Sequence, residues 1–221
     1  MLRSAGDGLG LRNACDGARA TWLPFEAPTA MPACYLYILP LPNEDLAKVG
    51  ISVDPLARVR AFAPRYYECF DLEHSGLVGY DSVAEARRRE TALHRRLRAW
   101  NATAPLTVPL RAGGHTEWFR GALAILHDEA EADRAAGHLV HLPAGDWWRH
   151  RLRQEQAQLY EWIEQYLHDV PAQELPGTAL WQGIVDVLDA WPAMGLGVDE
   201  VLPDAFQGVY RAYRRAWSAV L

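Results

Sequence analysis

Two short segments that read as β-strands, joined by turn residues, constrain this chain most strongly. Residues 34–39 and 47–51 have the length and composition of strands, and residues 42–45 (Pro-Asn-Glu-Asp) supply turn chemistry between them. Because successive side chains of a strand point to opposite faces, Tyr35 and Tyr37 share one face of this hairpin. The fold must therefore contain an antiparallel sheet built on residues 34–51.

The segments that follow alternate between helix and strand signals. An Asp-Pro pair at 54–55 starts a helix that ends near Ala63, since aspartate caps a helix and proline suits its first position. A third strand lies within 73–80. A capping box at 82–85 starts a long helix that ends near Trp100. These elements predict a small three-stranded antiparallel sheet flanked by helices.

Beyond this unit the apolar residues recur at helical spacing. A helix is expected over 116–136, and residues after 145 read as helix throughout. The fold class is therefore α+β, a small three-stranded sheet with helices followed by an all-α C-terminal region. We expect residues 1–33 to be a disordered or mis-called N-terminal extension, 34–136 to form the sheet-containing domain with a trailing helix, and 143–221 to form a Trp-rich helical region.

Charge and cysteine content narrow the function classes. The chain carries 22 Lys and Arg against 28 Asp and Glu, a net charge of -6, which excludes a basic nucleic-acid coat protein. Residues 34–121 hold 12 basic and 10 acidic side chains, whereas 122–221 hold 7 and 15, so only the first part would tolerate a phosphate backbone. The odd count of three cysteines argues against a disulfide framework. No apolar run in the sequence is long enough to span a bilayer. We expect a cytoplasmic protein that does not bind a membrane.

One acidic residue interrupts the apolar stripe of the 83–100 helix. Glu90 occupies a position where the pattern calls for Leu or Ala. Burying an ionised carboxylate without a partner costs on the order of several kcal/mol. Glu90 should therefore face a cleft or a cation. The alternative is a structural ion pair with Arg58 or Lys48. His94 lies one turn on and points to nearly the same side, although a lone histidine is more often simply packed.

Each of these signals has an ordinary structural explanation when taken singly. Tyrosines in a strand usually serve packing, a strand lysine such as Lys48 usually protects an edge, and Arg58 and Arg60 could lie on a solvated face. Taken in order, however, five motifs form a series. They are Tyr-Leu-Tyr-Ile at 35–38, Lys-Val-Gly-Ile-Ser at 48–52, Asp-Pro-Leu-Ala-Arg at 54–58, Glu-Thr-Ala-Leu-His at 90–94 and Glu-Trp-Phe at 117–119.

This series resembles the GIY-YIG nuclease superfamily, in particular its short bacterial, phage and fungal branch with Lys-x-Gly and Glu-x-x-Leu-His motifs. The resemblance implies catalytic roles for Tyr37, with Tyr35 as a rival, and for Lys48, Arg58 and Glu90. It also implies that Glu90 holds one divalent metal ion, Mg²⁺ or Mn²⁺.

Three further polar residues are expected to contact the substrate: Arg60, His94 and Glu117. Of these, Glu117 falls near the last polar active-site position of the superfamily. Lysine stands where the type pattern has a second tyrosine, which leaves open which group handles the proton.

The chemistry of these residue types agrees with the resemblance. Phosphodiester hydrolysis needs an activated water, stabilised phosphoryl oxygens and help for the leaving oxygen. Glutamate can hold Mg²⁺, the guanidinium fork of Arg58 matches phosphate oxygens, and a deprotonated Tyr37 could accept the proton of the water. We therefore expect a divalent-metal-dependent endonuclease acting on DNA, with RNA not excluded as substrate.

Two alternatives remain open at this point. The same fold could serve as a catalytically inactive module that binds nucleic acid or protein, which the small positive excess of residues 34–121 favours. The C-terminal helices, which hold six of the nine tryptophans, could bind a protein partner or mediate self-association.

Overall fold

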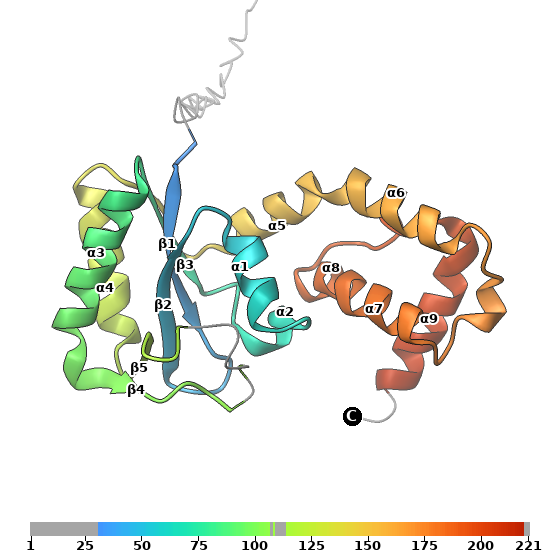
Figure 1. Cartoon of the computed structure of the whole chain (residues 1–221), viewed down its shortest axis with the longest axis horizontal. Helices are drawn as coiled ribbons and strands as arrows, with labels where there is room; N and C mark the ends of the chain where they lie inside the picture. Colours follow the sequence, from blue (N-terminus) through green and yellow to red (C-terminus); the bar gives the residue numbers. More distant parts are fainter. Residues whose placement is uncertain (1–30, 107, 109–113, 219–221) are drawn as a thin grey trace, which may run out of the picture. The chain divides into compact units, whose positions relative to one another are not determined.

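The computed structural model describes residues 31–106, 108 and 114–218, so nearly all of the predicted N-terminal extension 1–33 lies outside the described residues. Six strands of this part of the chain form one antiparallel sheet in the order β4-β5-β2-β1-β3-β6 (Figure 1). The strands are β1 (Cys34–Pro40), β2 (Leu46–Ser52), β3 (Gly76–Tyr80), β4 (Asn101–Ala102), β5 (Trp118–Arg120) and β6 (Leu139–His141). The α+β class is confirmed, and the prediction of a three-stranded sheet is wrong.

The three unpredicted strands are short and extend the sheet on both sides. β5 pairs with β2 over Leu46–Lys48 and carries β4 on its outer edge, while β6 pairs with β3. The helix expected over 116–136 is also wrong at its start, because residues 118–120 pair with β2 and the chain turns at Gly121 with a φ of 73°. Helix α4 (Leu123–Ala135) follows this turn.

The remaining elements of the first part match local signals in the sequence. Helix α1 (Pro55–Phe62) begins where the Asp54 side chain accepts hydrogen bonds from the backbone N–H groups of Leu56 and Ala57, each at 3.1 Å. Helix α3 (Val83–Arg96) begins at Ser82, whose side chain accepts from the N–H of Glu85. Each cap satisfies helix-terminal N–H groups that have no partner within the helix.

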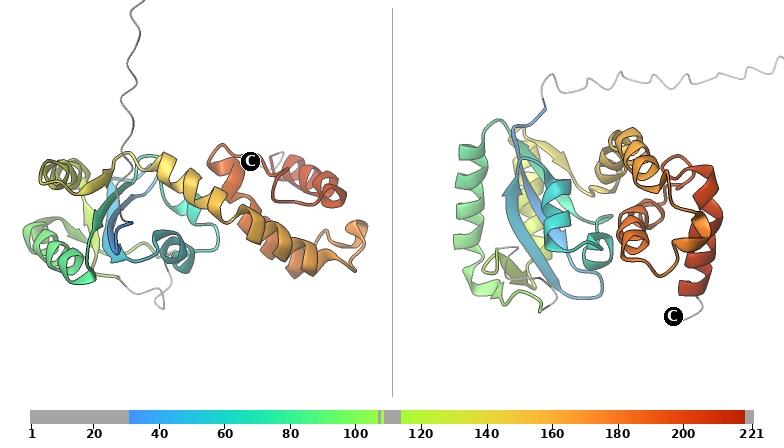
Figure 2. Two further views of the ribbon diagram at one scale, coloured as in Figure 1. Left: turned by 90° about the horizontal axis from the view of Figure 1, so that it is seen from above. Right: turned by 45° about the vertical axis from the view of Figure 1, so that its right-hand side comes forward.

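The sheet carries a hydrophobic core on each face. Helices α3 and α4 lie side by side on one face, and α1 and the short α2 (Tyr66–Cys69) lie on the other, as Figures 1 and 2 show. Leu36, Ile38 and Val49 pack toward α3 and α4, whereas Tyr35 and Tyr37 belong to the core on the α1 side. The alternation of the strand residues thus separates the two cores, as the period of 2 requires.

The chain from residue 145 to 218 is helical apart from its connections. It contains α5 (Gly145–Gln154), α6 (Gln156–Leu167), η3 (Ala172–Glu174), α7 (Ala179–Leu188), α8 (Ala190–Ala193) and α9 (Asp204–Ser218). Trp148, Trp181 and Trp191 are buried in the core that also contains Tyr35 and Tyr37. Within the described residues, no helix has both the length and the apolar character needed to cross a membrane.

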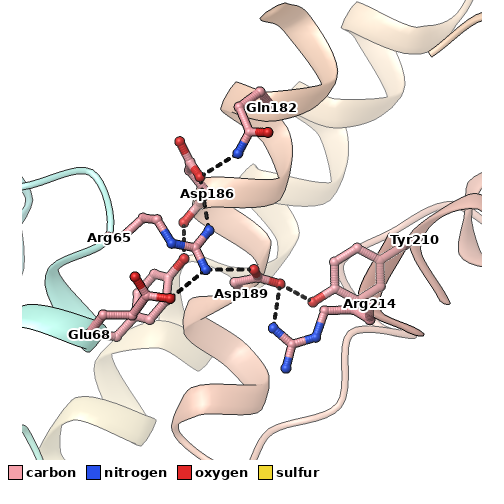
Figure 3. A network of polar contacts seen from close by, with 8 residues as sticks. Arg65, Glu68, Gln182, Asp186, Asp189, Tyr210 and Arg214 are labelled. Carbon is pink, nitrogen blue, oxygen red and sulfur yellow. Dashed lines mark hydrogen bonds and ion pairs between the residues drawn. The ribbon is translucent and has the colours of Figure 1, made fainter. Parts of the chain in front are cut away.

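A polar network joins α2 to the C-terminal helices (Figure 3). The guanidinium of Arg65, just before α2, forms ion pairs with Glu68 at 2.7 Å, Asp186 at 2.9 Å and Asp189 at 3.0 Å. The Asp189 carboxylate is 1% exposed and also accepts a 2.6 Å hydrogen bond from the Tyr210 hydroxyl. These contacts fix α7 and α9 against the segment that follows α1.

Candidate active site at the edge of β2

The predicted site residues gather where the pairing of β5 with β2 stops. β5 pairs with β2 up to Lys48, after which the Val49 N–H donates to the carbonyl oxygen of Glu117 at 3.0 Å. Glu117 thus lies beside β2 at the level of Val49, next to the Lys48 side chain that it binds.

Tyr37 and Gly50 are cross-strand partners on the α1 face. They oppose each other in the β1–β2 register, and a Cβ built on Gly50 would collide with the hydroxyl and ring of Tyr37. The glycine is therefore needed for the phenol to cross β2. Burial raises the pKa of Tyr37 to about 12, against the opposing effect of the nearby Arg58 guanidinium. The phenol is protonated at neutral pH, so Tyr37 is a hydrogen-bond donor here.

Replacing Gly50 with alanine should destabilise the protein by about 1–3 kcal/mol, because the new methyl group forces Tyr37 out of its position. Urea unfolding measures this change. Gly183, inside α7, has open space within 4 Å of the position that a methyl group would take, and Gly183→Ala should leave stability equal or raise it by up to about 1 kcal/mol. Equal midpoints for Gly50→Ala and wild type would contradict the crossing of the phenol over Gly50.

Lys48 is enclosed and bound to Glu117. Its Nζ atom has no exposed surface, donates to Glu117 Oε2 at 2.7 Å and to the carbonyl oxygen of Gly114 at 2.9 Å, and lies over the rings of Phe62 and Trp118. Burial lowers the pKa of Lys48, while the Glu117 carboxylate acts in the opposite direction. Edge protection, the ordinary explanation for a strand lysine, does not apply, because β2 is an inner strand.

Arg58 extends from α1 toward Tyr37. Its guanidinium lies 4.4 Å from the centre of the Phe62 ring and lowers the pKa of Tyr37. Between residues 31 and 218, leaving aside the undescribed positions, no carboxylate forms an ion pair with Arg58. A planar donor fork without an anionic partner is suited to receive phosphate oxygens.

Glu90 reaches the same place from α3, on the opposite face of the sheet. Its side chain is 11% exposed, and its only ion pair among the described residues is a 3.8 Å contact with the exposed Arg87. Desolvation raises the pKa of Glu90, and the Glu117 carboxylate raises it further, with partial compensation from His94, Arg87 and Lys48. Glu90 also acts electrostatically on Tyr37. The structural ion pair with Lys48 or Arg58 is not formed, because Lys48 is bound to Glu117.

The other predicted residues divide into two groups. His94 packs against Phe119 with ring centroids 5.4 Å apart, and its buried Nε2 has no hydrogen-bond partner among the described residues. It lies beside Glu90. Tyr35 instead contacts Trp147 at 5.4 Å between ring centroids, and Arg60 is ion-paired with Glu155 at 2.7 Å. The structure therefore groups His94 with Glu90, while Tyr35 and Arg60 face the C-terminal helices.

The surroundings of Lys48 were not found from the sequence. Gly114, with a φ of 67°, has no room for a side chain because a Cβ would collide with Lys48 Nζ and Glu117. Phe62 and Trp118 complete the enclosure. The one available signal was the paired glycines at 113–114 shortly before Glu117, which permit a close backbone approach to a side chain.

The donor set fits a single hard cation at Glu90. The described part of the chain contains no group of three or more His, Cys, Asp and Glu side chains that could hold a metal ion. Mg²⁺, however, usually keeps several waters and needs only one or two protein carboxylates together with substrate phosphate. An enclosed carboxylate whose only ion pair among the described residues is a 3.8 Å contact with an exposed arginine meets this requirement.

Comparison with known families places the chain in a domain family. Residues 34–170 match the model of the T5orf172 domain, well over half of the chain, so the chain belongs to the T5orf172 domain family. This is a phage-type, nuclease-like domain, which points to interaction with nucleic acid. The match gives no direct evidence for membership of the GIY-YIG superfamily. No curated protein and no solved structure matches the chain.

Proposed function

We propose that the chain is a divalent-metal-dependent endonuclease that hydrolyses phosphodiester bonds in DNA, with a site of the GIY-YIG type. The observation that carries the proposal is the position of Glu90. Its carboxylate is almost fully enclosed, and its nearest cation is 3.8 Å away on an exposed arginine. The lysine that could have neutralised it is bound to Glu117 instead. A pure binding module gains nothing from an enclosed carboxylate whose charge is only partly compensated, because such a charge repels phosphate.

Each residue has a chemical role in this proposal. Glu90 would hold Mg²⁺ or Mn²⁺, which supplies Lewis-acid stabilisation of phosphoryl charge and a more acidic water when bound. Arg58 donates its guanidinium N–H groups to phosphoryl oxygens. Tyr37, protonated because burial raises its pKa to about 12, donates its O–H to the attacking water or to a phosphoryl oxygen.

The Lys48–Glu117 pair occupies the remaining side of the site. Glu117 is 25% exposed, so its carboxylate is open to solvent on the side away from Lys48. We assign it the acceptance of the proton that leaves the attacking water. Lys48 then holds Glu117 in place through the 2.7 Å ion pair and the bond to the carbonyl oxygen of Gly114.

Incubation with supercoiled plasmid tests the activity. With a few millimolar Mg²⁺ or Mn²⁺ the purified protein should nick or linearise the plasmid. Excess EDTA should abolish this cleavage. Without the metal ion, Arg58 alone would stabilise the phosphoryl charge, because Lys48 is bound to Glu117. Binding of the plasmid without cleavage in either metal would favour the inactive-module alternative and overturn the proposal.

A further inference from the structure

Helix α3 carries an excess of positive charge that is distributed unequally over its surface. Residues 83–98 hold six arginines and two glutamates. On the flank that faces α4, Arg89 binds Asp133 at 3.0 Å and Glu129 at 2.8 Å, and Arg96 binds Glu129. These two arginines hold α3 against α4.

The other flank has no such partners. Arg88, Arg95 and Arg98 are exposed, and no carboxylate of the described residues forms an ion pair with them. Arg87 is 68% exposed, and its one ion pair with a described residue is the 3.8 Å contact with Glu90. We call these four arginines the α3 basic flank. Its charges are left for solvent or for a ligand.

The flank has a hollow between its arginines. Ala84, Thr91 and Ala92 are short side chains that alternate with Arg87, Arg88 and Arg95 and leave a depression of about 530 Å³. Positions 84, 88, 91 and 95 follow each other at intervals of three or four residues, so they form one row along the helix. A row of this kind presents guanidinium groups along an open trough.

The row is continuous with the candidate active site. At 100° per residue, Glu90 and His94 lie next to Arg87, and Arg98, Arg95 and Arg88 follow in the same direction around the helix. Arg87 makes the connection directly, through its contact with Glu90. Arg95 and Arg88 lie on the outward face of the helix, about 140–160° around it from Glu90, and Arg98 and Arg87 occupy the interval between them. A polyanion held by the row therefore reaches the Glu90 carboxylate by way of Arg98 and Arg87.

Helix stability does not account for this arrangement. Basic residues in the last turn, such as Arg95, interact favourably with the helix dipole, but Arg88 lies in the middle of α3, where that effect has faded. Glu85, three positions before Arg88, contacts His138 at 3.9 Å and forms no ion pair with Arg88. Among the described residues, no ion pair accounts for the charge at position 88.

We propose that the α3 basic flank binds the phosphate backbone of DNA and guides it to Glu90. The inference rests on the proposed function for its substrate, but it concerns binding rather than cleavage. Arginine forks match phosphate oxygens, and contacts of this kind position the duplex without reading its sequence. The flank would supply the basic surface that residues 34–121 as a whole lack.

The test measures binding of a fluorescently labelled DNA duplex of about 25 base pairs in EDTA, where cleavage does not interfere. We expect the double variant Arg88→Ala/Arg95→Ala to bind at least about 10-fold more weakly at low salt, and its plot of log K against log salt to be shallower by about 2. Arg153→Ala removes an exposed arginine of α5, on the opposite face of the sheet, and should change neither quantity.

Two results would overturn the inference: wild-type protein that does not bind the duplex, or a double variant with wild-type affinity and salt dependence. Circular dichroism checks that α3 remains folded, and Arg88→Lys/Arg95→Lys, which keeps the charge, should recover most of the salt dependence. Salt-dependent binding through the flank without any plasmid cleavage in Mg²⁺ or Mn²⁺ would refute the proposed function while supporting the flank.

Discussion

Glu90→Gln should reduce plasmid cleavage at least about 100-fold, because it removes the carboxylate assigned to hold the metal ion, and metal stabilisation of phosphoryl charge is worth several kcal/mol. The substitution keeps the size and the hydrogen-bonding shape of the side chain. The cleavage rate of Glu90→Gln should stay low even at Mg²⁺ concentrations that saturate the wild-type protein. Cleavage at close to the wild-type rate would refute the role of Glu90 and with it the metal-dependent mechanism.

Two controls separate loss of metal binding from loss of fold. The pKa of Glu90 is raised by desolvation and by Glu117, so the ionised carboxylate destabilises the native state at pH values above its native pKa, and Gln at this position should be as stable as wild type or more so. Mg²⁺ should raise the melting temperature of wild type but not of Glu90→Gln. Glu85→Gln, in the first turn of the same helix, should cleave normally and keep the Mg²⁺ response.

The parts of the fold that the sequence predicted are those determined by neighbours along the chain. The hairpin follows from strand composition around a turn, and α1 and α3 begin at Asp54 and Ser82 because each side chain caps the helix directly after it. Glu90 was recognised for the same reason, as a polar residue that breaks a local apolar period. Even there, Val83 and Trp100, the apolar side chains at the two ends of the 83–100 segment, are exposed.

The parts that could not be predicted depend on partners far along the chain. β5 has three residues and no period of its own, and it is a strand only because β2 offers backbone groups to pair with it. The partner of Lys48 is Glu117, 69 positions away, and that of Arg60 is Glu155, 95 positions away. Arg89 is indistinguishable in sequence from the exposed Arg88, and only the carboxylates of α4 give it a structural role. The local sequence pattern predicts which face of an element is buried and where a helix is capped. Which charged residues pair with each other depends on the tertiary fold.

Asp189→Ala should produce the largest loss of stability of the variants considered, about 3–5 kcal/mol, because the carboxylate is buried and binds three groups. The change leaves the buried Tyr210 hydroxyl without its acceptor and removes one of the three carboxylates that bind Arg65 (Figure 3). For a protein of this size the loss corresponds to a fall of about 10 °C in melting temperature. Thermal unfolding and urea unfolding both measure it.

The matched control is Asp199→Ala, an exposed aspartate of the same helical region, which should change stability by less than about 0.5 kcal/mol. Asp189→Asn keeps an acceptor for Tyr210 and loses the charge, so its effect should fall between the two.

If the Arg65 ion pair is the main contact, Arg65→Ala and Asp189→Ala combined should cost clearly less than the sum of the single variants. Additive losses, or a loss below about 1 kcal/mol for Asp189→Ala, would show that the network does not hold the helices. Because Arg65 follows directly after the helix that carries Arg58, a loosened network should also weaken substrate binding, while the metal-induced rise in melting temperature persists.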